Sequence, residues 1–430
     1  MGNRLLVRLQ WFRERCESQL GMAVIEPKHD RDSRPGAIVI VAAALMGIGL
    51  IMVASASATV ERSGVPDPFW RTVFGRQGMF ILAGLIVMVA SWRLSPALLD
   101  RPRARSWLSV ALCIIVFVCL VATFVPGWAH ARHGSPRWVQ LTPLGHGFGF
   151  QPSELAKLAL VALLAVLLGE RQGDVRSFNR GFLPAAAAIA VCVLLVGVAN
   201  FSTAVLLGGV GFLTLFVAGC RGRYLALVAV SGAVGMSILL FAYPYRTARL
   251  TAYRDIWADA QGAGYQPLQS LVTIASGGWL GQGLGAGVQK YGYLPESHSD
   301  FIFAVVCEEM GLVGGGLVIG LFCVLVFLGL QVMWSARTGF ERLLAFGITA
   351  CLGLQAAMNI AVVTVMAPTT GIPLPLVSAG GSGLLTYSLA LGVLAAMASR
   401  GVPAPEAGAF RIARHGGGVQ TAGCPEGVAW

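Results

Sequence analysis

The sequence is poor in charged residues. Only 12% of its 430 residues are Asp, Glu, Lys or Arg, whereas 56% are hydrophobic; an average soluble domain has roughly 25% charged residues. This composition excludes an ordinary water-soluble domain. The loops expected to face outward also lack cysteine. The nine cysteines fall in or beside apolar segments, except for Cys16 and Cys424 in the terminal tails, which excludes a disulfide framework or a cysteine metal cluster.

Long apolar runs dominate the sequence instead. A spanning helix needs about 20 apolar residues, and the runs that reach this length predict an all-α integral membrane protein with about ten transmembrane helices. The first run follows a polar, basic stretch that is too long for a signal peptide, so we expect it to be an anchor. We expect tails at 1–36 and 400–430, with a disordered C-terminal tail, around a membrane domain at 37–399. The predicted spans are 37–58, 77–94, 107–127, 154–170, 182–199, 202–220, 223–243, 300–333, 343–367 and 379–399.

The positive charge predicts the orientation of the spans. Most of the 31 Lys and Arg residues lie in the two tails and in the loops on the same side of the membrane. The positive-inside rule therefore places both termini in the cytoplasm, with most of the net charge at the anionic cytoplasmic leaflet. Loops 128–153, 244–299 and 368–378 then face outward, and the largest lies between spans seven and eight. So long a loop is uncommon unless it is functional.

A first candidate site lies where the outer loop 128–153 enters the fourth span. The segment Gln151-Pro152-Ser153-Glu154-Leu155-Ala156-Lys157 resembles a helix start, with Ser153 as the expected N-cap and Glu154 near the positive end of the helix dipole. An ionisable residue inside a span indicates function by default, although a lysine near a span end also snorkels to the surface. Lys157 lies three residues after Glu154, so the two side chains share a face and are able to pair.

Further candidates lie in the largest loop and beyond it. Its alternation of Gly with polar and aromatic residues predicts an irregular or re-entrant segment that lines a water-filled cavity. Four carboxylates of this outer region, Asp255, Asp259, Glu296 and Asp300, are candidates for a catalytic base, and the sequence alone does not choose among them. The Glu308-Glu309 pair in the eighth span needs partners or a cavity. The prolines of 368–378 exclude a regular helix and predict a constrained loop.

These motifs together resemble the SEDS (shape, elongation, division, sporulation) family of cell-wall polymerases over residues 37–399. The resemblance rests on Gln-Pro-Ser-Glu-Leu-x-Lys at 151–157, Gly-x-Gly-Tyr-Gln at 262–266, Leu-Pro-Glu-x-His-x-Asp-Phe-Ile-Phe-Ala at 294–304 and Pro-Thr-x-Gly-x-Pro-Leu-Pro at 368–375. The sequences at 51–57 and 289–296 are more similar to the FtsW branch than to the RodA branch.

The resemblance implies an inverting peptidoglycan glycosyltransferase that polymerises lipid II at the outer face of the membrane during cell division. It implies Asp259 as the catalytic base. It also implies a divalent cation, Mg or Mn, for which the sequence shows no ligand cluster. The partners implied are a class B penicillin-binding protein (an FtsI-like transpeptidase) and other divisome proteins at the septum, with no nucleic acid. The expected contacts to the undecaprenyl diphosphate-linked substrate are Arg137, Glu154, Lys157, Arg246, Gln269, Lys290, Glu296, His298, Asp300 and Ser378.

Three positions depart from the usual family pattern and keep two alternatives open. Asn200 replaces an aspartate, Thr370 a lysine and Ala379 a tyrosine. These departures add weight to a divergent paralogue with weak or specialised activity, or to a non-catalytic scaffold that activates a transpeptidase. Asp259, Glu296, His298 and Asp300 are nevertheless in place, which favours an enzyme. A lipid II transporter (flippase) is the other alternative, and it would depend on charges within the spans. A polymerase would depend on Asp259 at the outer edge.

Overall fold

The computed structural model describes residues 33–57, 75–123, 125, 129–132, 135–140, 149–170, 175–289 and 292–400. The predicted tails 1–36 and 400–430 lie almost wholly outside these residues. Within them, nine helices are long and apolar enough to cross a membrane. They are α2 (Arg34–Ser57), α4 (Arg76–Leu99), α5 (Pro102–Ala122), α6 (Pro152–Gly169), α7 (Leu183–Ala199, preceded by a π-helical turn Phe178–Phe182), α9 (Gly222–Phe241), α12 (Ile302–Trp334), α13 (Gly339–Val363) and α14 (Gly381–Ser399).

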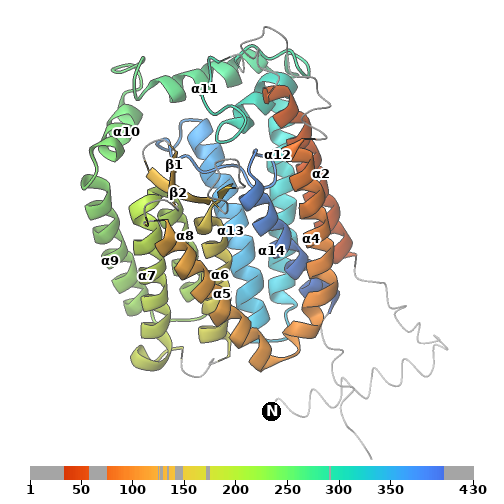
Figure 1. Cartoon of the computed structure of the whole chain (residues 1–430), viewed down its shortest axis with the longest axis vertical. Helices are drawn as coiled ribbons and strands as arrows, with labels where there is room; N and C mark the ends of the chain where they lie inside the picture. Colours follow the sequence, from red (N-terminus) through yellow and green to blue (C-terminus); the bar gives the residue numbers. More distant parts are fainter. Residues whose placement is uncertain are drawn as a thin grey trace, which may run out of the picture.

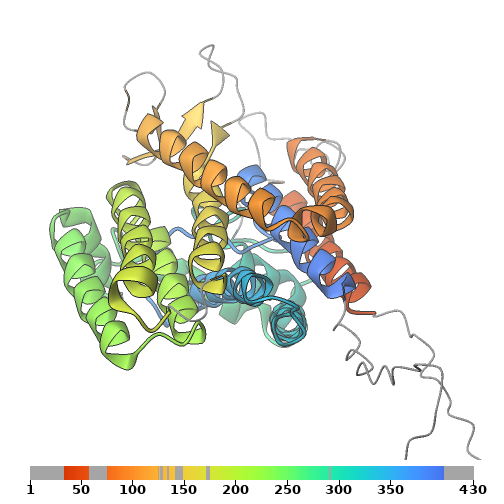
Figure 2. The same cartoon turned by 90° about the horizontal axis from the view of Figure 1, so that it is seen from below.

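The tenth apolar helix, α8 (Phe201–Val217), has only 17 residues. With it, every one of the ten predicted spans corresponds to a helix, and the predicted fold class is confirmed. Seen from below, the helices form a bundle in which α6, α13 and α14 are the more buried and α9 lies at one edge (Figure 2). α14 packs mainly on α4 and α2, while α13 packs on α12 and α6.

Glycines allow the closest contacts in this bundle. A Cβ atom on Gly49 of α2 would lie 2.6 Å from the carbonyl oxygen of Val377, and one on Gly169 of α6 would lie 2.6 Å from the backbone of Phe340. No hydrophobic effect drives helices together within lipid, so close backbone packing stabilises the association instead. The high glycine content therefore has a structural role at particular contacts.

The predicted outer loop 128–153 contains a small antiparallel sheet that the sequence did not reveal. Its order is β1 (Ala129–Arg132), β2 (Ser135–Gln140) and β3 (Gly149–Phe150). Gly149 lies under the Trp138 ring, where a Cβ atom would be 3.3 Å from the nearest ring atom. β2 contacts α6 and α7, so the sheet lies over the ends of these two helices.

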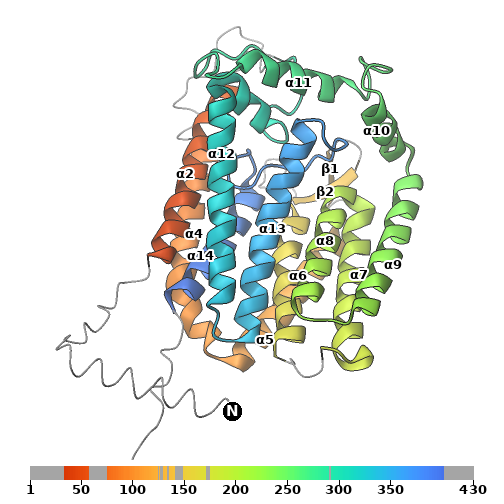
Figure 3. The ribbon, with the colours of Figure 1, turned by 180° about the vertical axis from the view of Figure 1, so that it is seen from behind.

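The long segment between α9 and α12 was expected to be irregular or re-entrant, but it contains two helices. α10 (Pro244–Arg254) and α11 (Tyr265–Gly277) are helices that lie across one end of the bundle (Figures 1 and 3). The prediction holds for 278–289 and 292–300, which form turns and irregular structure. α11 keeps the helical period, with Pro267, Ser270, Thr273 and Gly277 buried. We call this end, with α10, α11 and the sheet, the loop end; the opposite end, with Arg34 and Arg400, is the terminal end.

Candidate functional site

A buried ionic network lies in the first turns of α6. Lys157 Nζ donates to Glu154 Oε2 at 2.7 Å and to Gln355 Oε1 at 2.5 Å. Tyr387 Oη donates to the same Gln355 oxygen at 2.7 Å, and its ring centroid lies 4.9 Å from the Lys157 ammonium. The expected pairing of Glu154 with Lys157 is therefore present. Snorkelling is excluded, because Lys157 is only 2% exposed and faces α13 and α14.

The start of α6 differs from the prediction in one detail. Gln151 is the N-cap, Pro152 occupies the first helical position, and no side chain caps the helix. Ser153 is therefore not the N-cap. Proline is favoured at the first helical position because its missing N–H is not needed there and its φ is already helical. The helix consequently begins two residues earlier than the capping pattern suggested.

The network continues into the proline-rich segment that precedes α14. Gln355 Nε2 donates to Pro373 O at 2.9 Å. Asn359, one turn further along α13, donates from Nδ2 to the carbonyls of Asp300 and Ile372. Sequence reasoning missed Gln355 and Asn359, although amide side chains in an otherwise apolar span were a visible signal. These two residues fix the constrained loop to α13.

Ser378 joins this loop to the segment that carries the other predicted site residues. Its hydroxyl donates to Ser299 O at 2.6 Å and accepts the N–H of Leu374 at 2.8 Å. The N–H of Ala379 donates to His298 O at 3.0 Å. Any residue at position 379 makes this backbone contact, so the departure at Ala379 leaves it intact. Ser378 and the Glu296–Asp300 segment therefore come together as expected.

The remaining polar groups of this segment face different surroundings. Glu296 has a positive φ of 55°, and its Oε2 accepts the Ser299 hydroxyl at 3.0 Å. His298 is exposed, while Asp300 is half-buried at the start of α12. Gln269 is half-buried on α11. Their roles as substrate contacts stay predictions.

The buried Glu308-Glu309 pair accepts hydrogen bonds from the turn segment and from α2, although Glu308 Oε2 has no hydrogen-bond partner among the described residues. Glu308 Oε1 accepts the N–H groups of Val288 and Gln289, and Glu309 Oε2 accepts the N–H of Gly285 at 2.9 Å. Ser55 of α2 donates to Glu309 Oε1 at 2.6 Å. The two carboxylates therefore hold the glycine-rich turn segment against α12, which is a structural use of charge near the loop end.

Asp259 lies in the turn between α10 and α11. Its side chain is exposed, and Oδ2 accepts the N–H of Ala263 at 2.8 Å. The second oxygen, Oδ1, has no hydrogen bond to any residue that the structure describes. Asp255, four residues earlier, uses Oδ1 to accept the N–H groups of Trp257 and Ala258. Both are exposed turn residues, and each has one carboxylate oxygen without a hydrogen bond to a described residue. The choice of Asp259 over Asp255 therefore rests on its place in the Trp257–Gln266 motif.

The expected cations are differently placed. Arg246 is 4% exposed and donates to the carbonyls of Gly197, Val198 and Leu239, at the ends of α7 and α9 where a cation offsets the negative helix dipole. Arg137 belongs to β2, but its side chain lies outside the described part. Lys290 lies outside the described residues altogether.

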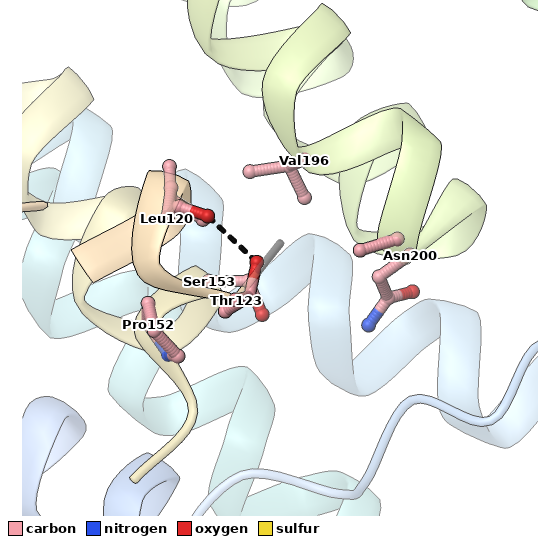
Figure 4. Close-up of a pocket in the computed structure, with 7 residues that line it drawn as sticks. Leu120, Thr123, Pro152, Ser153, Val196 and Asn200 are labelled. Carbon is pink, nitrogen blue, oxygen red and sulfur yellow. Dashed lines mark hydrogen bonds between the residues drawn. The ribbon is translucent and has the colours of Figure 1, made fainter. Parts of the chain in front are cut away.

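A small pocket opens where α5, α6 and α7 end at the loop end. Leu120, Thr123, Pro152, Ser153, Val196 and Asn200 line it (Figure 4). Its volume of about 10 Å³ has room for about one water molecule. Asn200, one of the three departures, also caps α8 by accepting the N–H of Thr203 at 3.2 Å. Asn200 is thus the N-cap of α8.

No group of three or more His, Cys, Asp or Glu side chains in the described ranges is placed to hold a metal ion. The Mg or Mn implied by the resemblance therefore finds no fitting set of protein ligands among these residues. No step of the reaction below is assigned to it.

The sequence of the helix bundle and its polar loop end matches a family sequence model. The model for cell cycle proteins of the FtsW, RodA and SpoVE type matches residues 36–401. The chain belongs to the FtsW/RodA/SpoVE family.

Curated relatives in this family span nearly the same length. A protein of Geobacter sulfurreducens named "Probable peptidoglycan glycosyltransferase FtsW" is 38% identical over 371 residues, which cover 86% of this chain and 96% of the relative. Stage V sporulation protein E of Bacillus subtilis is 38% identical over 361 residues, covering 83% and 94%. The predicted family and enzyme class are confirmed at this level.

Solved structures of the FtsW/RodA/SpoVE family share the fold. A chain of a peptidoglycan synthase complex, described as coordinating polymerization and crosslinking, is 26% identical with a TM-score of 0.66, covering 84% of this chain and 96% of that one. The rod shape determining protein RodA of Thermus thermophilus is 25% identical with a TM-score of 0.57, covering 87% and 98%. The chain is therefore a multi-span membrane protein of this fold.

Proposed function

We propose that this family member polymerises lipid II into glycan strands at the outer face of the cytoplasmic membrane during cell division. The observation that carries the proposal is the exposed Asp259 carboxylate at the loop end, whose Oδ1 is available to a ligand. The similarity to proteins named probable peptidoglycan glycosyltransferases supports the substrate class.

Asp259 acts as the general base in this reaction. One carboxylate oxygen takes the proton from the acceptor sugar hydroxyl. At the same time, the hydroxyl oxygen attacks the anomeric carbon of the growing chain. The bond from that carbon to the diphosphate breaks, undecaprenyl diphosphate leaves with the electron pair, and the configuration inverts. The hydrogen bond from Ala263 to Oδ2 orients the carboxylate and leaves Oδ1 to receive the proton.

The cations have two different tasks in this proposal. Lys157 and Arg246 are buried and make hydrogen bonds within the protein, so they fix the start of α6 and the ends of α7 and α9. Arg137 and Lys290 belong to segments of the predicted outer loops and are assigned to the departing diphosphate, where a charge-assisted contact stabilises the developing charge. Asp259, Glu296, His298 and Asp300 complete the candidate substrate surface.

The transporter alternative fits the structure less well. Such a protein is expected to depend on charges at mid-membrane. Glu154 and Lys157 lie in the first two turns of α6, and Glu308 and Glu309 hold the turn segment by its N–H groups. All four charges are near the loop end and engaged with the protein.

The orientation follows from the charged residues at the terminal end. Arg34 donates to Ser335 at 2.8 Å, and Arg400 forms an ion pair with Glu341 at 2.7 Å, so both ends of the described chain lie on one side. Arg93, Arg103 and Arg342 belong to the same end. We assign this end to the cytoplasm by the positive-inside rule. We also propose that the protein acts at the division septum.

We propose that a single-pass class B penicillin-binding protein, an FtsI-like transpeptidase of the divisome, docks on the lipid-facing side of α12. Gly316 and Gly320 are four residues apart there, and a Cβ atom on either would meet open space. Val313, Leu317 and Phe327 lie exposed beside them. Small residues at this spacing let a second helix approach closely.

The function is tested by supplying lipid II in detergent to the purified chain, with and without its transpeptidase partner. The proposal expects glycan polymer, and more of it with the partner. A chain that moves lipid II across vesicles without ever forming polymer would support the transporter. Failure of both assays, with normal activation of the transpeptidase, would support the scaffold.

A further inference from the structure

A cavity of about 480 Å³ lies between α5, α6 and α7. Only apolar side chains and two cysteines line it, among them Phe117 and Leu120 of α5, Leu160 and Leu163 of α6, and Ala188 and Val191 of α7. Its size falls in the range of roughly 300–1,000 Å³ that is usual for ligand pockets. None of the residues proposed for catalysis lines it.

The depth of the cavity matches one leaflet of a bilayer. On α5 its lining runs from Val110 to Leu120, which at 1.5 Å per residue is about 15 Å. This is half of the roughly 30 Å hydrocarbon core. Val110 lies near the middle of α5 and Leu120 at its loop end. The cavity therefore occupies the leaflet at the loop end, which is the outer leaflet in the proposed orientation.

The cavity is open toward the bilayer. Ile114, Phe117 and Val191 line it and are 59%, 50% and 51% exposed. A chain embedded in the membrane is thus able to enter sideways between the helices. A ligand from water would have to cross the headgroup region first.

The upper end of the cavity leads to a polar rim. Leu120 lines both this cavity and the small pocket of Figure 4, whose other walls include Thr123, Ser153 and Asn200. Strand β2, which carries Arg137, contacts the ends of α6 and α7 next to this pocket. An apolar slot that ends in hydroxyl and amide groups below a basic strand fits a lipid with an anionic head.

We infer that the cavity holds the polyisoprenoid chain of the lipid-linked glycan, with its diphosphate in the headgroup region above the end of the cavity at Leu120, on the side of β2. This inference rests on the proposed function. The slot is bounded by three helices, α5, α6 and α7, and the competition experiment below distinguishes an isoprenoid chain from the acyl chains of a phospholipid. The alanine side chains at Ala159, Ala187 and Ala188 are smaller than their neighbours in the cavity wall. They leave room for the methyl branches of an isoprenoid.

The test uses the full chain in lipid nanodiscs and a polyprenyl diphosphate that carries a photoreactive diazirine near the end of its chain. The labelled peptides are identified by mass spectrometry. We expect labels on α5, α6 and α7 that excess undecaprenyl diphosphate removes and excess phosphatidylglycerol does not. A diazirine-bearing phosphatidylglycerol serves as the comparison probe.

A matched pair of variants on α7 sharpens the test. Ala188 lines the cavity, whereas Ala190 is exposed on another face of the same helix and does not line it. Ala188→Trp fills the slot and should lower labelling by about tenfold, the scale of an overpacking penalty. Ala190→Trp should leave labelling unchanged. If Ala188→Trp is not monodisperse, Leu163→Trp takes its place.

Equal labelling by both probes, without competition by undecaprenyl diphosphate, would overturn the inference in favour of bulk lipid. Undiminished labelling of folded Ala188→Trp would also overturn it. A chain that polymerises lipid II but is labelled elsewhere refutes only the cavity assignment. A chain that is labelled here but makes no polymer supports the assignment and refutes the proposed function.

Discussion

Lys157 Nζ lies 2.7 Å from Glu154 Oε2, and the two side chains are only 2% and 5% exposed. They are three residues apart on α6 and share Gln355 and Tyr387 as neighbours. Burying both charges has a large desolvation cost that their attraction and their hydrogen bonds offset. The pair therefore fixes the relative positions of α6, α13 and α14.

Removing one partner of this pair should be strongly destabilising. Lys157→Met leaves the Glu154 carboxylate buried without its cation, a loss of about 3–5 kcal/mol. Thermal unfolding in detergent measures the effect. The double variant Glu154→Gln, Lys157→Met should recover much of the loss, since no uncompensated charge remains. A double variant as unstable as the single one would contradict the ionic account.

The cap of α8 predicts a smaller effect. Asn200→Ala removes the acceptor for the Thr203 N–H and should cost about 1 kcal/mol of stability. Asn200→Asp keeps an acceptor at the N-cap and should remain within a few tenths of a kcal/mol of the wild type, by the same capping preferences. Comparing the two melting temperatures checks this. Equal losses would show that the departure at Asn200 concerns more than the cap.

Gly311 should not tolerate a side chain. Its φ is +68°, and a Cβ atom there would collide with the backbones of Trp279 and Gly281. Gly311→Ala should therefore displace the glycine-rich segment and destabilise the protein by several kcal/mol, as strain and overlap add. Gly232→Ala, in open space on α9, is the matched control and should be neutral or stabilising. Protease cleavage within 278–289 reports the displacement.

The proposed orientation is tested by labelling single cysteines in whole cells. Gln282 is exposed at the loop end and Arg103 at the terminal end. A membrane-impermeant maleimide should label Gln282→Cys in intact cells. Arg103→Cys should react only after the inner membrane is opened. The reverse pattern would contradict the assignment of the terminal end to the cytoplasm.

The spans were predictable because twenty consecutive apolar residues have few alternatives to crossing lipid. All ten positions matched a helix, although α6 begins at Pro152 rather than after Ser153. The pairing of Glu154 with Lys157 was also predictable, since helix geometry places residues three apart on one face. Both predictions depend on local sequence.

Contacts between distant segments were not predictable in this way. The sheet of β1, β2 and β3 depends on pairing between short strands, which have no clear sequence pattern. α11 was not predicted because glycines lie before and after it. Gln355 and Asn359 act on loops that lie far from them in sequence or across the bundle. Glu308 and Glu309 gave no sign that backbone N–H groups of the turn segment would be their partners.

The central claim concerns Asp259, and its most direct test is the initial rate of lipid II polymerisation by Asp259→Asn with the partner present. The amide still accepts the Ala263 N–H, so the turn is preserved, but it does not take up a proton. The account predicts a rate lower by a factor on the order of 10²–10⁴, while Asp255→Asn in the same segment stays within a few-fold of wild type. A wild-type rate for Asp259→Asn would contradict the account.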